Sequence, residues 1–277
     1  MNFPAEDYRC YNHPDREAYI SCQRCERLIC PECMREASVG FQCPSCIAEG
    51  AKTIRQPRTV AGGAITGREG RVSMILIAIN VAAYVAQVAT GGFSSEIYQR
   101  GAMQGYLVAD GDYWRLLTSA FLHNGLLHLA FNMYALYLFG PFVERALGTA
   151  RYVVAYLTAA VGGSISVYLI TDPLVGTAGA SGAIYGLLAM ALVFLLKAKQ
   201  DVRALLVLLA INAFISVAGA RISWEGHLGG FVAGLALGAV FAYAPRDRRT
   251  LVQVLAISAI WIAMIVAFVL RTSALTP

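Results

Sequence analysis

One serine lies among glycines and alanines at the head of a long apolar run. The stretch reads Gly176-Thr177-Ala178-Gly179-Ala180-Ser181-Gly182-Ala183-Ile184-Tyr185-Gly186. Small neighbours leave a hydroxyl accessible and let a second helix approach closely. Small residues are also routine in membrane helices, so this stretch alone makes Ser181 a candidate nucleophile and no more.

Other polar residues with suitable chemistry lie in two further apolar runs. His128 and Asn132 are four residues apart, so they project from one face of a helix. His227 begins a stripe that continues through Gly230, Gly234 and Gly238. That glycine face can press against a neighbouring helix, for which the small residues around Ser181 make the natural surface.

The first fifty residues carry a different chemistry. Four pairs of soft ligands share one spacing, with two residues between partners: Cys10 and His13, Cys22 and Cys25, Cys30 and Cys33, Cys43 and Cys46. Eight such ligands make two tetrahedral zinc sites. A disulfide framework is the alternative, but seven cysteines is an odd number and His13 fills the eighth place. We therefore predict two structural Zn²⁺ ions in a domain at residues 1–50 with too little core to fold alone.

The spacing resembles a B-box-type zinc finger, in which the first pair joins the third and the second joins the fourth. The last pair here is Cys–Cys rather than His–His, and sequential pairing is the alternative. Residues 1–50 hold five arginines, no lysine and eight carboxylates, a balance of −3. Nucleic-acid readers carry a basic footprint, so we expect a protein partner for this module and no nucleic acid.

The composition of the whole chain indicates a membrane protein. Of its 277 residues 57% are hydrophobic and only 14% charged, against about 25% in soluble domains. Residues 51–71 are rich in Gly, Thr and Arg without helical periodicity, and are expected to form a flexible linker.

Seven apolar segments follow the linker, each near the roughly 20 residues that span hydrocarbon. They are predicted at 72–90, 122–143, 151–170, 180–197, 202–219, 225–244 and 251–270. With a cytoplasmic N-terminus, the inner flanks hold thirteen Lys and Arg residues, Arg55 included. The outer side then holds only Arg100, Arg115, Arg221 and Arg271, so we expect the N-terminus inside and the C-terminus outside.

This orientation places the polar residues at one depth. The second, fourth and sixth segments all begin at the outer surface, which puts His128, Asn132, Ser181 and His227 in the outer half of the bilayer. Polar groups inside a membrane are costly and usually face a partner or a water-filled cavity. A single histidine more often bonds a backbone carbonyl, so the convergence of these groups is what favours catalysis. Asn80 and Asn212 are assigned to helix–helix hydrogen bonds.

Together these residues resemble the rhomboid family of intramembrane serine proteases over about residues 72–270. The matching motifs are Trp114-Arg115, His123, His128-x3-Asn132, Glu144-Arg145, Gly179-Ala180-Ser181-Gly182 with Tyr185, and Gly226-His227 before the glycine stripe. The resemblance implies an all-α polytopic membrane protein with a six-helix core plus a seventh C-terminal helix. The membrane domain would cover 72–277, after the zinc domain and the linker.

The resemblance also implies roles for individual residues. Ser181 would be the nucleophile and His227 the general base and acid, with Tyr185 stacked on the imidazole. His128, Asn132 and the Ser181 N–H would form the oxyanion hole, and no cofactor would be needed for catalysis. No carboxylate is expected behind His227, because Glu144 is at the far end of its helix and Glu225 is on another face. Trp114, Arg115, Glu144 and Arg145 are expected to be architectural.

The predicted function is an intramembrane endopeptidase of the plasma membrane that cleaves transmembrane substrates near the outer face. Three alternatives exist: a non-catalytic relative that binds membrane helices for quality control, a transporter or channel, and a zinc module held by a membrane anchor. The first would be expected to lack Ser181 or His227, and the second should have polar residues through both leaflets. The third does not require seven helices.

Overall fold

A computed structural model of the chain describes residues 8–53, 57–65, 67–219 and 222–275. It divides into two compact units, Met1–Gln56 and Pro57–Pro277. Arg55 and Arg221, which enter the charge count above, lie outside the described residues.

The first unit is built from very short elements. They are β1 (Ile20–Ser21), β2 (Leu28–Ile29), the 3₁₀ turn η1 (Pro31–Cys33), β3 (Arg35–Glu36), β4 (Phe41–Gln42) and α1 (Pro44–Thr53). β1 pairs with β2 and β3 with β4, both antiparallel. Besides six cysteines, the buried cluster of the described residues contains only Ala18 and Ile29. An apolar core this small cannot hold the unit together by itself.

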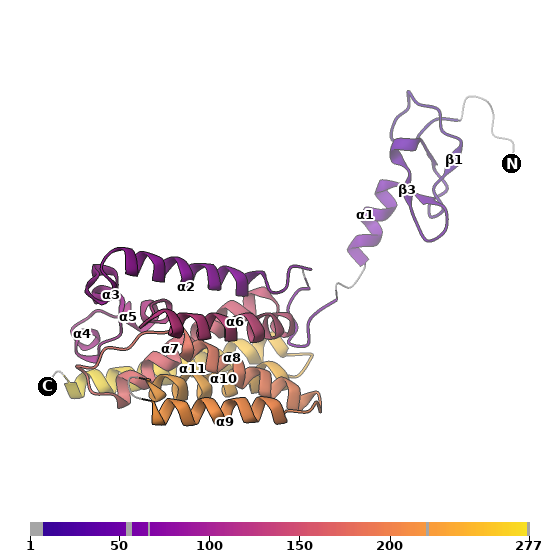
Figure 1. Cartoon of the computed structure of the whole chain (residues 1–277). Helices are drawn as coiled ribbons and strands as arrows, with labels where there is room; N and C mark the ends of the chain where they lie inside the picture. The colour runs from indigo at the N-terminus through magenta and orange to yellow at the C-terminus, as the bar shows by residue number, and fades with distance from the viewer. Residues whose placement is uncertain (1–7, 54–56, 66, 220–221, 276–277) are drawn as a thin grey trace. The chain divides into compact units, whose positions relative to one another are not determined.

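The second unit is helical (Figure 1). Its long helices are α2 (Arg71–Ala89), α6 (Leu126–Leu147), α7 (Thr149–Ile170), α8 (Ser181–Lys197), α9 (Arg203–Ala218), α10 (Trp224–Tyr243) and α11 (Arg249–Leu275). The prediction of seven apolar helices is confirmed, because each predicted segment coincides with one of them to within a few residues. Five are long and apolar enough to cross a membrane, while α8 and α9 are shorter.

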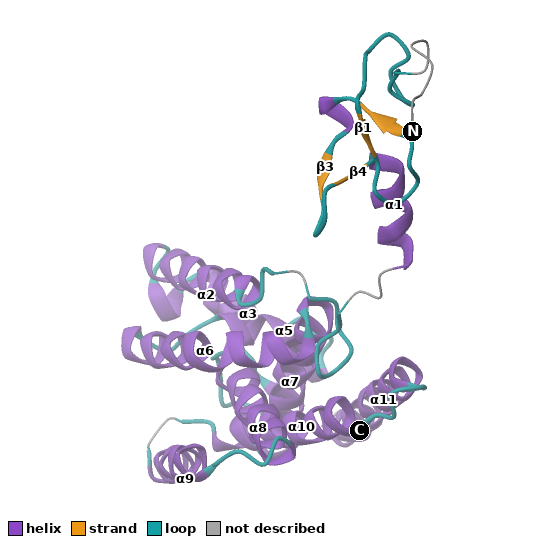
Figure 2. Ribbon diagram, turned by 90° about the vertical axis from the view of Figure 1, so that its right-hand side faces the viewer, coloured by secondary structure: helices purple, strands orange, loops and turns teal. Residues whose placement is uncertain are grey.

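Helix α7 is the central helix of this unit. Nearly three quarters of its apolar window, 72%, is buried, against 6% for α11. Figure 2 shows α9 and α11 at opposite edges, with α7, α8 and α10 between them. The edge helix α11 is tied to α7 by Trp261, whose Nε1 donates to Thr158 Oγ1 at 3.1 Å.

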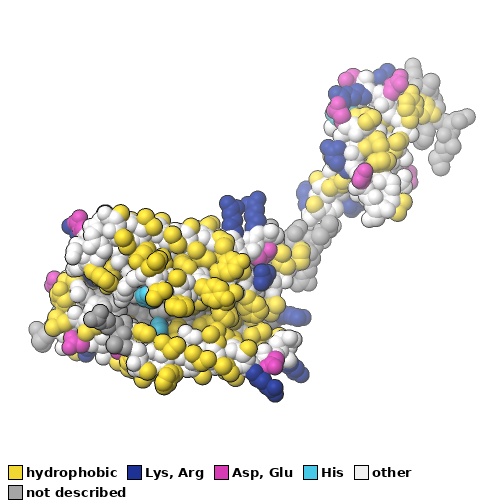
Figure 3. All heavy atoms as spheres, in the orientation of Figure 1, with side chains coloured by type: hydrophobic (Ala, Val, Ile, Leu, Met, Phe, Trp, Pro, Cys, Tyr) yellow, Lys and Arg dark blue, Asp and Glu magenta, His cyan; other side chains and the backbone are white. Residues whose placement is uncertain are grey.

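Successive long helices alternate in direction, which gives the unit two distinct ends. One end is marked by three contacts between helix termini: Ser73–Glu144 joins a start to an end, Arg151–Gln253 joins two starts, and Lys197–Tyr243 joins two ends. Most Lys and Arg side chains visible on this unit gather at one end in Figure 3. Helices α6, α8 and α10 begin at the opposite end, so their first turns lie together there.

Glycines set the spacing between α8 and α10. A Cβ built on Gly230 would overlap the carbonyl oxygen of Gly182, and one on Gly234 would overlap that of Gly186. The expected glycine stripe therefore does press against α8, and only glycine allows backbones this close. Gly179, expected to share this contact, faces His128 instead.

The expected linker is shorter than predicted. Its first residues, 51–53, belong to α1, and residues 57–65 belong to the second unit and pack on its helices. Ala61 is buried, its N–H donates to Ala146 O at 3.2 Å, and its carbonyl accepts from Gln253 Nε2 at 3.0 Å. Small residues allow this close packing, and the same composition is typical of flexible segments.

The long connection between α2 and α6 forms short helices. These are η2 (Gly92–Ser94), α3 (Glu96–Gly101), α4 (Gly105–Ala109), α5 (Arg115–Thr118) and η3 (Ser119–Phe121). Arg115 is buried and holds them together: its Nη1 donates to Gln99 O and Ala102 O at 2.7 and 2.8 Å, and its Nε bonds Asp112 at 2.8 Å. Arg115 is therefore architectural, as expected.

Candidate active site and metal centres

Ser181 is the first residue of α8, and the strand-like segment before it is pinned on both sides. Thr177 and Met103 exchange two backbone hydrogen bonds of 2.9 Å, and Gly179 N donates to Ser119 O at 2.9 Å. Gly179 has φ of +150°, a conformation that L side chains rarely adopt. The sequence thus delivers Ser181 from a rigid turn rather than from a free loop.

His128, in the first turns of α6, reaches the same turn. A Cβ on Gly179 would lie 2.6 Å from His128 Cε1, 2.9 Å from Nε2 and 3.6 Å from Ser181 Oγ. The imidazole and the hydroxyl therefore converge over Gly179. His128 Nδ1 accepts from Asn124 N at 3.4 Å, which leaves the proton on Nε2. The nitrogen nearest the turn is thus a hydrogen-bond donor.

Asn132 lies one helical turn beyond His128 and is buried. Its Nδ2 donates to the His128 carbonyl at 2.9 Å, which fixes the amide against α6. An amide nitrogen carries two protons, so the second is left to donate elsewhere.

His227 lies in the first turn of α10, where Ser223 caps the helix by accepting from Gly226 N at 3.3 Å. Its ring stacks on Tyr185, with centroids 4.2 Å apart and planes inclined by 10°. Tyr185 is one turn after Ser181 on α8, so one helix face carries the serine and the ring that supports the histidine. The stacking that the family resemblance implies is present.

The second ring contact of His227 was not foreseen. Its Nδ1 lies 2.7 Å from the hydroxyl of Ser216 in α9, and Tyr185 OH lies 3.2 Å from the same oxygen. The one available signal is that Ser216 lies near the C-terminal end of its apolar segment, which the predicted topology places at the depth of the other polar groups. No hydrogen bond between Ser181 and His227 is recorded among the described residues. Catalytic hydrogen bonds are often long before substrate binds.

A small cavity of about 40 Å³ adjoins Ser181. Its lining is dominated by small residues, among them Gly163, Gly179, Gly182 and Ala183. This volume accommodates a water molecule or a small side chain. In Figure 3 histidine side chains reach the surface of this unit next to hydrophobic side chains.

His123 packs against His128. It is fully buried, its ring lies edge-to-face on His128 with centroids 5.2 Å apart, and Gln87 Nε2 donates to its carbonyl at 2.9 Å. Gln87, near the end of α2, is a second supporting residue that the sequence did not single out.

The carboxylates of Glu144 in α6 and Glu225 in α10 bond groups other than His227. Glu144 accepts from Val72 N, Ser73 N and Ser73 Oγ at 3.2, 3.0 and 2.8 Å, at the opposite end of the unit. Glu225 accepts from Ser223 Oγ at 3.1 Å.

Asn80 and Asn212 do not make the expected helix–helix hydrogen bonds among the described residues, because each Nδ2 donates to a carbonyl of its own helix, four residues back.

The first unit brings its eight ligands together in two groups. Each group draws on two pairs, and within it the ligand atoms lie within 4.8 Å of one another: Cys10, His13, Cys30 and Cys33 in one, Cys22, Cys25, Cys43 and Cys46 in the other. The first pair thus joins the third and the second joins the fourth, which is the interleaved arrangement. All seven cysteines are free thiols in the structure.

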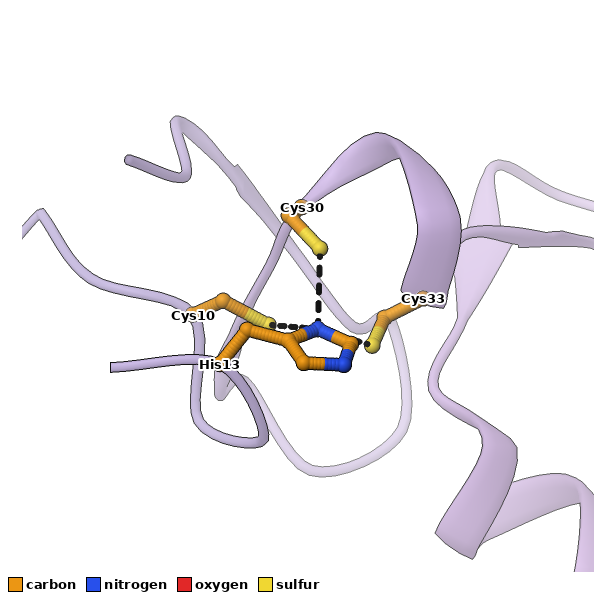
Figure 4. A group of neighbouring side chains, drawn as sticks. All are labelled: Cys10, His13, Cys30 and Cys33. Carbon is orange, nitrogen blue, oxygen red and sulfur yellow. Dashed lines mark hydrogen bonds between the residues drawn. The ribbon is translucent and has the colours of Figure 1, made fainter. Parts of the chain in front are cut away.

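The spacing within these groups fits a tetrahedral ion. Figure 4 shows His13 Nδ1 facing three sulfurs, at 3.3 Å from Cys30, 3.4 Å from Cys33 and 3.9 Å from Cys10. Bonds of roughly 2.0–2.3 Å to a central zinc require ligand atoms about 3.5–3.8 Å apart. In the other group Cys25 and Cys43 sulfurs are 3.8 Å apart. Both groups could hold a metal ion.

Arg27 adds a charge to the all-cysteine group. Its Nε donates to Cys25 Sγ at 3.3 Å, and this hydrogen bond lowers the pKa of the Cys25 thiol. Thiolates are the form that binds metal, and four of them around a divalent ion leave a net negative charge that a guanidinium offsets.

Comparison with known proteins matches a family model, the Rhomboid domain, to residues 110–244. The chain is 36% identical over 167 residues to rhomboid protease GluP of Bacillus subtilis, covering 58% of this chain but only 32% of that protein. It is 36% identical over 163 residues to the putative rhomboid protease YdcA of the same organism, covering 56% of this chain and 81% of that one. Rhomboid protease AarA of Providencia stuartii is 28% identical over 213 residues, 75% of its length.

Proposed function

The chain belongs to the rhomboid family of intramembrane serine proteases, and we propose that it hydrolyses peptide bonds of transmembrane substrates with Ser181 as nucleophile. The observation that carries the proposal is the convergence of Ser181 Oγ and the His128 ring over Gly179, one helical turn from the stacked pair Tyr185 and His227.

The first step forms a bond between Ser181 Oγ and the scissile carbonyl carbon. His227 takes the Ser181 proton on Nε2 and returns it to the leaving amine, and water then repeats the sequence on the acyl-enzyme. Among the described residues no carboxylate bonds the imidazole of His227. Stacking on Tyr185 is what limits the rotation of the ring instead.

The developing oxyanion needs donors that are already in place. We assign His128 Nε2–H, the free amide proton of Asn132 and the Ser181 backbone N–H to this role, and such donors contribute about 3–4 kcal/mol each in other hydrolases. The tautomer of His128 set by Asn124 supports the assignment.

Substrate and water reach the site from the end of the unit where α6, α8 and α10 begin. The cavity beside Ser181 favours a small side chain next to the scissile bond. A substrate helix must unwind locally there, because helical carbonyls are tied up in hydrogen bonds.

The protein is a multi-pass integral membrane protein. We propose the plasma membrane, with the N-terminus in the cytoplasm and the C-terminus outside, because most Lys and Arg residues flank the end of the helices opposite Ser181.

The reducing cytosol would keep the cysteine thiols of the first unit available to bind metal. Two Zn²⁺ ions would then stabilise a protein-interaction module, and its acidic balance argues against nucleic acid.

The test is cleavage of a single-pass model substrate by purified protein in detergent. Ser181→Ala and His227→Ala should each abolish cleavage, whereas Ser273→Ala, which removes a hydroxyl bonded within α11, should not. Undiminished cleavage by Ser181→Ala would overturn the proposal.

A further inference from the structure

Ser216 is an unusual residue for its helix. Of the described residues of α9 only Leu205 and Ser216 are buried, and the rest of this edge helix is mostly apolar and largely exposed. A hydroxyl with 4% exposure on such a helix is costly unless it is fully bonded.

Three polar atoms surround the Ser216 hydroxyl. Asn212 O lies at 2.6 Å, His227 Nδ1 at 2.7 Å and Tyr185 OH at 3.2 Å. A serine hydroxyl has one proton to donate and two lone pairs that accept. Its surroundings therefore use all of its bonding capacity.

The distances decide where each proton lies. Asn212 O can only accept, and two oxygens 2.6 Å apart without a proton between them repel each other, so Ser216 donates to Asn212 O. Ser216 Oγ must then accept from both Tyr185 OH and His227 Nδ1. His227 consequently carries its proton on Nδ1, and Nε2 keeps a free lone pair.

We infer that Ser216 is a positioning residue that holds His227 in the tautomer a general base requires. The inference rests on the proposed function of Ser181 and His227. When Nε2 takes the Ser181 proton, the bond from Nδ1–H to Ser216 also shares the positive charge that develops on the ring. A neutral hydroxyl on α9 thus fills the place that a carboxylate occupies in three-residue serine hydrolases.

The same bond links the docking of α9 to catalysis. Ser216 is one of the two buried residues of this helix among those described, so displacing the C-terminal half of α9 would free the imidazole as well. His227 would then be bonded correctly only while α9 is seated.

The first readout is the tautomer itself, from ¹⁵N spectra of histidine-labelled full-length protein in detergent, with the His227 signals assigned by their loss in His227→Gln. We expect the Nδ1–H form in the wild type and a mixture of both tautomers in Ser216→Ala. Leu205→Ala truncates the other buried side chain of α9 and should lower thermal stability without changing the tautomer. An unchanged His227 tautomer in Ser216→Ala would overturn the inference.

The second readout is kinetic. Ser216→Ala should lower kcat about tenfold with KM within roughly twofold, as for loss of one hydrogen bond in the transition state. Ser216→Thr and Ser216→Val have nearly the same shape and differ in the hydroxyl, so any strain from the added methyl is common to both. We expect Thr to cleave about tenfold faster than Val.

The outcomes separate the two proposals. Equal rates for Thr and Val, with Ser181→Ala inactive, would overturn the role of Ser216 and leave the Ser181 mechanism standing. Full activity of Ser181→Ala would overturn the mechanism, while the tautomer measurement would still decide whether Ser216 sets the protonation of His227.

Discussion

Gly179 is the residue on which the geometry of the site depends most directly. Its φ of +150° and the His128 ring that fills the space of a side chain leave room for hydrogen alone. Gly179→Ala should therefore displace His128 and strain the turn by about 1–2 kcal/mol, and lower kcat at least tenfold.

The matched control is three residues upstream. A Cβ on Gly176 would meet its nearest neighbour, Gln104, at 3.7 Å, an ordinary contact without positive φ. Gly176→Ala should keep kcat within about twofold in the same cleavage assay. Equal losses in the two variants would refute the special role of Gly179.

Asn132 offers a test of the oxyanion assignment. Removing one such donor costs about 10²–10³-fold in kcat in other hydrolases, so Asn132→Ala should show a large fall in kcat with little change in KM. Asn80→Ala removes the same kind of bond, from Nδ2 to a carbonyl four residues back, in α2. It should change thermal stability while kcat stays near wild type. A normal kcat in Asn132→Ala would remove this residue from the site.

At the scale of elements, Glu144 joins α6 to the start of α2. Its buried carboxylate accepts three hydrogen bonds from Val72 and Ser73. Glu144→Gln places an amide donor opposite those donors and should lower stability by about 2–3 kcal/mol, seen as a lower thermal unfolding midpoint. Glu96→Gln loses only an exposed pair with Arg100 and should cost no more than about 0.5 kcal/mol. Equal midpoints for the two variants would contradict this account of α2.

The helices were predictable from the sequence because hydropathy and length determine membrane spans almost alone. The meeting of Ser181, His128 and His227 at one end followed from counting which helices begin there. Ser216 and Gln87 could not be found this way, since a polar residue in an apolar helix has a role only once the rotation of that helix is known. The packing of residues 57–65 was missed because Gly-rich composition is shared by flexible segments and by closely packed ones.

At the scale of the whole molecule, the protein combines two units with different sources of stability. The membrane unit depends on helix packing, with backbones of α8 and α10 in contact at Gly182 and Gly230. The N-terminal unit has almost no apolar core beyond its cysteines. The spacing of the four ligand pairs is uniform, so interleaved and sequential grouping could be distinguished only by the fold.

Metal analysis of the full-length protein should return two zinc ions per chain. Cys10→Ser and Cys22→Ser, each in a different group, should each reduce the content to about one. Because metal binding supplies folding free energy, a strong chelator should make residues 8–53 sensitive to protease while the helical unit stays resistant. A content of one or none in the wild type would refute the eight-ligand assignment.

The central claim, that Ser181 is a nucleophile activated by His227, is tested most directly by a serine-reactive fluorophosphonate followed by mass spectrometry of the labelled peptide. The account predicts one modified residue, Ser181, in the wild type, and loss of the label in His227→Ala. Label on another serine, or undiminished labelling of Ser181 in His227→Ala, would contradict it.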